Sequence, residues 1–316
     1  MLNRRHLRIK IFHALYAYFQ QSKESLDKGE KELFHSIAKM REMYISLLLI
    51  FVEIAHQANL HIEEKKRKKL PSHEDLNPNM RFVENALIVQ LEQNQALKNA
   101  AEKEKMGWGQ QQEMMKKMYR MLIETDEYKS YMEAPETDYE SDRQLIISLF
   151  KTYVVNHEPL QQYFEDNSIY WVDDLDLASS MVLKTFKLFG EGSGSDQPIL
   201  ELYKDPEDEQ QFVRQLYRQT ILQSVENEAL INAKAENWDM ERIALLDMIL
   251  MKMALSEARE FRQIPTKVTL NEYIEISKYY STPKSNTFIN GILDKLFAEM
   301  KESGMIKKTG RGLIEN

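Results

Sequence analysis

Residues 285–296 read Ser-Asn-Thr-Phe-Ile-Asn-Gly-Ile-Leu-Asp-Lys-Leu, and their apolar side chains recur at the spacing of one face of an α-helix. The same helical period extends over nearly the whole chain of 316 residues. No window combines apolar–polar alternation with enrichment in β-branched residues, which is the pattern of a strand. The sequence therefore predicts an all-α fold without a sheet.

The composition supports long helices and narrows the class of protein. Only 10 Gly and 8 Pro are present, and the absence of Cys excludes disulfides, thiolate zinc sites and cysteine nucleophiles. The most apolar stretch, 43–52, is shorter than the ~20 residues that a membrane span needs. We therefore expect a cytoplasmic protein with no membrane segment.

Charge is distributed unevenly along the chain, although the formal net charge is -8. Residues 1–23 contain no acidic residue, whereas 121–143 and 191–209 are strongly acidic. Overall acidity therefore does not exclude an anionic partner at the amino end. The basic run 65–69 is typical of a solvated helix end, and contact of this run with RNA stays open.

The first predicted helix, with Asn3 as its N-cap, begins with the arginines Arg4, Arg5 and Arg8. Cations at a helix amino end oppose the macrodipole, at ~0.3–1 kcal/mol each. Exposed arginines beside rings such as Tyr16 suit single-stranded RNA, because guanidinium groups bind phosphate and rings stack on bases. The alternative is a solvated basic helix end beside ordinary core aromatics.

Two local patterns near the carboxyl end give further expectations. Thr269 and Glu272 have the spacing of a capping box at a helix start. Gly291 lies inside an apolar helix, where Gly costs ~1 kcal/mol relative to Ala. We therefore expect another backbone to pack closely at Gly291.

A helix predicted at about 238–261 is apolar almost all round, which a lone surface helix would not tolerate. Lys252 and Ser256 mark its expected solvent face, and Asp247 points the opposite way. Burial of an unpaired carboxylate would cost several kcal/mol, as a rough figure. Asp247 is therefore either paired with an internal cation or exposed at the centre of an apolar docking patch.

Three segments together resemble the NusB family of bacterial transcription antitermination factors. Residues 4–16 resemble its arginine-rich turn leading into an Ala-Leu-Tyr helix. Residues 264–278, Ile-Pro-Thr-Lys-Val-Thr-Leu-Asn-Glu-Tyr-Ile-Glu-Ile-Ser-Lys, are similar to the family's Val-Pro-x-Lys-Val-x-Ile-Asn-Glu-x-Ile-Glu-Leu-x-Lys. Residues 285–294 are similar to its Ser-x-x-Phe-Val-Asn-Gly-Val-Leu-Asp.

The resemblance implies a NusB-like helical bundle that binds RNA, with no catalytic activity and no cofactor or metal. Members pair with the ribosomal protein NusE, bind the boxA element of nascent ribosomal RNA, and act with other Nus factors on RNA polymerase to resist termination. Asp247 falls where the family has an acidic residue facing NusE. By position, the implied RNA-binding residues are Arg4, Arg5, Arg8, Tyr16, Lys284, Ser285 and Phe288.

The resemblance also suggests how the chain is divided. Residues 1–35 hold the first helix with its RNA-binding turn, and 201–303 form the carboxyl-terminal bundle. Residues 36–200 are a helical insertion, or elaborated helices, of unassigned role, and 304–316 are a flexible tail. The sequence leaves open whether the chain is a monomer or a homodimer.

Other classes of protein fit less well. Glu-x-x-His occurs at 32–35 and 53–56, as in di-iron bundles, but on one helix these motifs lie ~32 Å apart. A ribosomal RNA methyltransferase would need parallel strands and a glycine-rich turn, which the sequence lacks. The remaining alternative is a helical protein-interaction scaffold in ribosome biogenesis that does not bind RNA directly.

Overall fold

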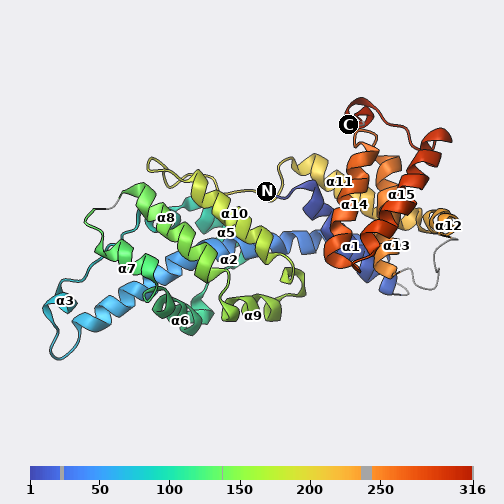
Figure 1. The fold of residues 1–316 in the computed structure, drawn as a ribbon. Helices are drawn as coiled ribbons and strands as arrows, with labels where there is room; N and C mark the ends of the chain where they lie inside the picture. The colour runs from blue at the N-terminus through green and yellow to red at the C-terminus, as the bar shows by residue number, and fades with distance from the viewer. Residues whose placement is uncertain (22–24, 137, 236–243, 315–316) are drawn as a thin grey trace. The chain divides into compact units, whose positions relative to one another are not determined.

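In the computed structural model the described residues, which are all except 22–24, 137, 236–243 and 315–316, form helices and no strand (Figure 1). The predicted all-α class is confirmed. The α-helices are α1 (Arg4–Gln20), α2 (Leu26–Lys66), α3 (His73–Leu76), α4 (Ala86–Gln93), α5 (Gln95–Glu104), α6 (Gln112–Leu122), α7 (Asp126–Glu133), α8 (Tyr139–Leu149), α9 (Glu158–Asn167), α10 (Leu175–Leu188), α11 (Pro206–Leu222), α12 (Ser224–Lys234), α13 (Leu245–Glu260), α14 (Thr266–Tyr280) and α15 (Ser285–Glu302).

Several helices are shorter than the apolar period predicts, because caps interrupt it. Asn94 ends α4 and also begins α5, where its side chain accepts a hydrogen bond from the Leu97 amide at 2.8 Å. A π-helical turn at Phe150–Val154 follows α8 directly. The expected start of the helix at 238 lies outside the described residues.

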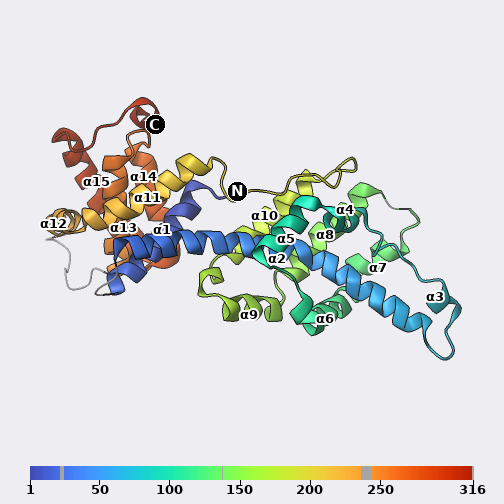
Figure 2. The same ribbon diagram turned by 180° about the vertical axis from the view of Figure 1, so that it is seen from behind.

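The helices form two compact units, which Figure 2 shows from behind. Unit 1 consists of Met1–Ile37 and Tyr203–Asn316, and unit 2 consists of Ala38–Leu202. The chain passes from unit 1 to unit 2 within α2. All the side chains that the sequence predicts for RNA or NusE binding belong to unit 1.

Unit 2 is built on the apolar face of α2. An 18-residue window of this helix is long and apolar enough to cross a membrane by length and composition, with a mean hydropathy of 1.4. The apolar stretch is thus longer than 43–52. However, 56% of the window is buried inside the protein, and Phe51 contacts the rings of Phe150 and Phe186. The core helix of a soluble protein passes the same composition test.

Unit 1 is built around α13, which packs against α1, α11, α12, α14 and α15 (Figure 1). Lys252 and Ser256, expected on its solvent face, are both buried. The Lys252 ammonium nevertheless has a partner, the Glu228 carboxylate of α12 at 2.6 Å. The apolar character of α13 on every side therefore reflects its central position in the bundle, and the expected apolar docking patch is wrong.

Two helical glycines of unit 1 have opposite surroundings. A Cβ at Gly29 would collide with the hydroxyl of Tyr217, whose side chain is fully buried. Nothing lies within 4 Å of a Cβ built at Gly291, so the expected close backbone at that position is wrong.

These surroundings predict opposite effects of one substitution. Gly29→Ala should lower the free energy of unfolding by ~1–3 kcal/mol, because the buried ring of Tyr217 must move. Gly291→Ala should raise it by ~0.5–1 kcal/mol, because Ala favours the helix and meets no atom. Urea unfolding of both variants measures the two changes. Destabilisation by Gly291→Ala would show that the space beside that residue is occupied.

Candidate nucleic-acid interface

The arginine-rich turn begins with a reciprocal cap. The Asn3 side chain accepts a hydrogen bond from the His6 amide at 3.0 Å, and the Asn3 amide donates to His6 Nδ1 at 3.3 Å. Burial, followed by the charge of Arg5, lowers the pKa of His6, which keeps the imidazole neutral and able to accept. The predicted N-cap at Asn3 is confirmed, and His6 has a role that the sequence did not reveal.

Arg4 and Arg5 are both ion-paired. Arg4 pairs with Asp208 at the start of α11, and its guanidinium carbon lies 4.1 Å from the centroid of the Phe212 ring. Arg5 donates twice to Glu272 of α14, at 2.8 and 3.0 Å, and its side chain is 43% exposed. The hydrogen bonds from Arg5 lower the pKa of Glu272, so the carboxylate is charged at neutral pH.

Arg8 is buried, contrary to the exposure expected for it. It is 2% exposed and donates twice to Glu257 of α13, at 2.7 and 2.8 Å. Glu257 also accepts from the hydroxyls of Thr269 at 2.8 Å and Tyr273 at 3.0 Å. Burial acts to lower the pKa of Arg8, but Glu257 outweighs it and raises that pKa above its ordinary value. An RNA phosphate cannot reach this guanidinium in the folded protein.

The predicted capping box of Thr269 and Glu272 is wrong. The helix α14 begins at Thr266, so both residues lie within the helix. Their side chains serve the arginine cluster instead, Thr269 through Glu257 and Glu272 through Arg5. The amino end of α14 has no side-chain cap, and no acidic residue lies in its first turn.

A second cluster brings Asp247 beside the start of α15. Asp247, in the first turn of α13, is 4% exposed and accepts a hydrogen bond from the Ser281 hydroxyl. The Ser281 and Thr282 hydroxyls lie 3.0 and 2.8 Å from that of Ser285. Among the described residues Asp247 has no ion-pair partner, and the amino end of α13 favours its charge. The expected internal cation is therefore replaced by a helix end and a hydroxyl.

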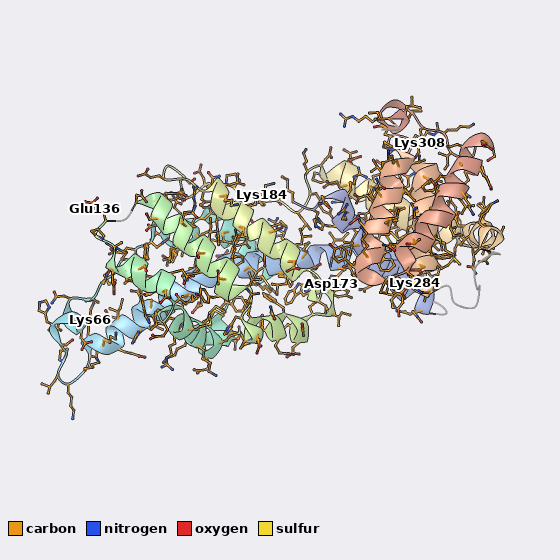
Figure 3. The ribbon with its side chains drawn as sticks, in the orientation of Figure 1. Lys66, Glu136, Asp173, Lys184, Lys284 and Lys308 are labelled. Atoms are coloured by element: carbon orange, nitrogen blue, oxygen red, sulfur yellow. The ribbon has the colours of Figure 1, made fainter. Side chains whose placement is uncertain are left out.

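Within the Ser-x-x-Phe segment, only the flanking cation is accessible. Ser285 and Phe288 are buried, whereas Lys284 is exposed at the N-cap position of α15. Figure 3 shows Lys284 and Lys308 at opposite ends of unit 1.

Aromatic residues connect the arginine cluster with the serine cluster along α1 and α14. The two helices run parallel, since Arg5 meets Glu272 and the ring of His13 lies 5.0 Å from that of Tyr280. Tyr16, one turn further along α1, is 41% exposed.

Next to Tyr280, Tyr279 is 80% exposed. The sequence did not single out this residue, although its place between a polar Lys278 and the end of the helix is a signal for exposure.

An open cleft of about 990 Å³ lies beside the amino ends of α1 and α14. Five cationic side chains but only two carboxylates line it. The cations come from α1, from α14 and from the segment after α15. The charged lining residues are Arg4, Arg5, Arg8, Lys267, Arg311, Asp208 and Glu272.

The basic run 65–69 lies in unit 2, at and beyond the end of α2. Lys66, which Figure 3 labels, pairs with Glu63 at 3.0 Å, and Lys68 pairs with Asp75 at 3.0 Å. These local pairs engage part of the run, and its contact with RNA stays a hypothesis.

Removing one member of the buried ion pair should be strongly destabilising. Arg8→Met or Glu257→Gln should lower the free energy of unfolding by ~3–5 kcal/mol, because the other member stays buried without its partner. Arg4→Met, which breaks a more exposed pair, should cost only ~0–1 kcal/mol. Urea denaturation of the three variants tests this order. Equal effects of Arg8→Met and Arg4→Met would contradict it.

Comparison with known sequences finds the same family throughout. The sequence model of the NusB family matches residues 177–298. The transcription antitermination protein NusB of Salinibacter ruber is 38% identical over 142 residues, which cover 43% of this chain and 89% of that protein. That of Listeria monocytogenes is 34% identical over 34% of this chain and 81% of its own length. That of Chloroherpeton thalassium is 41% identical over 30% of this chain and 46% of its own. No solved structure matches the chain.

Proposed function

The chain belongs to the NusB family of transcription antitermination factors, which are not enzymes, and we propose that it binds boxA-like RNA of nascent ribosomal RNA. In this proposal it acts in the cytoplasm, together with ribosomal protein NusE and an RNA polymerase carrying other Nus factors. The relatives named above are themselves transcription antitermination proteins.

The observation that carries RNA binding is the set of exposed cations and rings along α1 and α14. Arg5 and Tyr16 are eleven residues apart on α1, which corresponds to about 16 Å along the helix axis. Tyr279 and Lys284 lie at the far end of α14 and the start of α15. Cations that bind phosphate beside rings that stack on bases are the elements of a single-strand site.

Buried members of the predicted site take a supporting role in this proposal. Arg8 also approaches Glu272, at 3.5 Å, and so helps to hold the carboxylate that orients Arg5. Ser285 and Phe288 are buried where α15 begins and fix the position of Lys284. Arg4 can reach RNA only in exchange for its contact with Asp208.

Charge and stacking substitutions should have distinguishable effects. Arg5→Gln and Lys284→Gln should each weaken binding of a boxA-like single-stranded RNA and flatten the log–log salt dependence by about 0.7. Tyr16→Ala should weaken binding by ~1–3 kcal/mol with the slope unchanged, since stacking releases no counterion. Fluorescence anisotropy at a series of salt concentrations measures both quantities.

Lys295→Gln is the matched control, because Lys295 is an exposed cation of α15 about three turns from Lys284. It should bind RNA like the wild type. Equal losses in Lys284→Gln and Lys295→Gln would reduce the effect to overall charge. A wild-type protein that does not bind the RNA would favour the scaffold alternative.

We place the NusE contact at the amino end of α13. The family position of Asp247 and the adjacent exposed Leu245 support this assignment. Asp247→Asn keeps an acceptor for the Ser281 hydroxyl but removes the charge. It should therefore leave the melting temperature nearly unchanged and weaken NusE binding by at least about tenfold.

Asp294→Asn, an exposed site on α15, provides the control for this charge change in a calorimetric titration with NusE. Unfolding of Asp247→Asn would instead mark Asp247 as a purely structural residue. Unchanged NusE affinity in a folded Asp247→Asn protein would remove the residue from the interface.

A further inference from the structure

The segment after α15, expected to be a flexible tail, folds back onto unit 1. The Ile306 amide donates to the Met300 carbonyl at 2.9 Å, and the Ile306 side chain is buried. The Thr309 amide donates to the Arg262 carbonyl at 3.0 Å, in the turn between α13 and α14. The described part of this segment, residues 304–314, is therefore held against the bundle and is named the carboxyl segment below.

Two glycines allow the close approach. Gly310 has φ +54°, in the left-handed region where glycine is favoured. Gly312 is buried, and a Cβ there would collide with the backbone carbonyl of Arg262. Arg311 lies between them, is exposed, and lines the cleft beside the amino end of α14.

The charges of this cleft are unequal in availability. The three arginines of α1 already have carboxylate partners in Asp208, Glu272 and Glu257. The two other cations of the lining are Lys267 and Arg311. In the part of the chain that the structure describes, neither of these two has an acidic partner. The positive charge that is free to meet a ligand thus comes mainly from outside α1.

We propose that the carboxyl segment forms one wall of the RNA-binding cleft and that Arg311 contacts an RNA phosphate there. This inference rests on the proposed function, because it extends the surface of Arg5 across the same cleft. An unpaired guanidinium can bind a phosphate with two parallel hydrogen bonds, and it does not first have to leave a carboxylate. Lys267 supports the same phosphate path from the first turn of α14.

Arg311→Gln in the full-length protein tests the contact. Binding of the boxA-like RNA should weaken about fivefold at 0.1 M salt, with a log–log slope flatter by about 0.7, as for one lost single-strand phosphate contact. The matched control is Lys307→Gln, which removes the same charge from the same segment at an exposed residue that does not line the cleft. The control should bind like the wild type.

Gly312→Ala tests the docking independently of the charge of Arg311. Its Cβ must displace the segment from Arg262, so RNA binding should fall as it does in Arg311→Gln. Trypsin should also cleave the displaced segment faster than it cleaves the wild type. Thermal melts show whether the helices of each variant stay folded.

The outcomes separate this inference from the proposed function. Loss of binding in Arg5→Gln with wild-type behaviour of Arg311→Gln overturns only the role of the carboxyl segment. Equal losses in Arg311→Gln and Lys307→Gln also overturn it, since position would then not matter. Weaker NusE binding by Arg311→Gln at an unchanged RNA slope would assign the residue to a protein partner instead. No RNA binding by the wild type overturns both proposals.

Discussion

The buried ion pair between Arg8 and Glu257 is the constraint on which unit 1 depends. Neither charge can stay in the interior without the other, so α1 must pack on α13 in one register. The hydroxyls of Thr269 and Tyr273 complete the coordination of Glu257 and bring α14 into the same arrangement. Residues 249 positions apart in the chain are thereby fixed next to each other.

This register determines what the surface presents. With Arg8 facing inward, Arg5 one turn earlier meets Glu272 at the edge of α14, and Phe12 one turn later contacts the ring of Tyr280. The arginine-rich turn is therefore part of the framework as well as part of the candidate interface. Its net charge is largely balanced within the protein, and the groups that remain available to RNA lie around it.

The fold class was predictable because apolar residues recur with the helical period, whereas the partners of charged residues were not. Nothing near Arg8 in the sequence indicates Glu257, so an ordinary basic helix end and a buried ion pair look alike. Thr269 and Glu272 have the spacing of a capping box, but their contacts are tertiary. The burial of Lys252 depends on α12, which local sequence cannot reveal. Sequence thus identified the segments that form the site but not which side chains face solvent.

Docking of the carboxyl segment also couples its stability to proton binding. Burial lowers the pKa of Lys308 to about 8, with Lys301 acting in the same direction and Glu257 against it. The undocked lysine binds its proton more tightly than the docked one, so docking strengthens as pH rises from about 8 towards the ordinary lysine value of about 10.4. Below that window the segment is held most weakly while Lys308 carries its full charge. Near neutral pH this end of the protein therefore balances cohesion against positive potential.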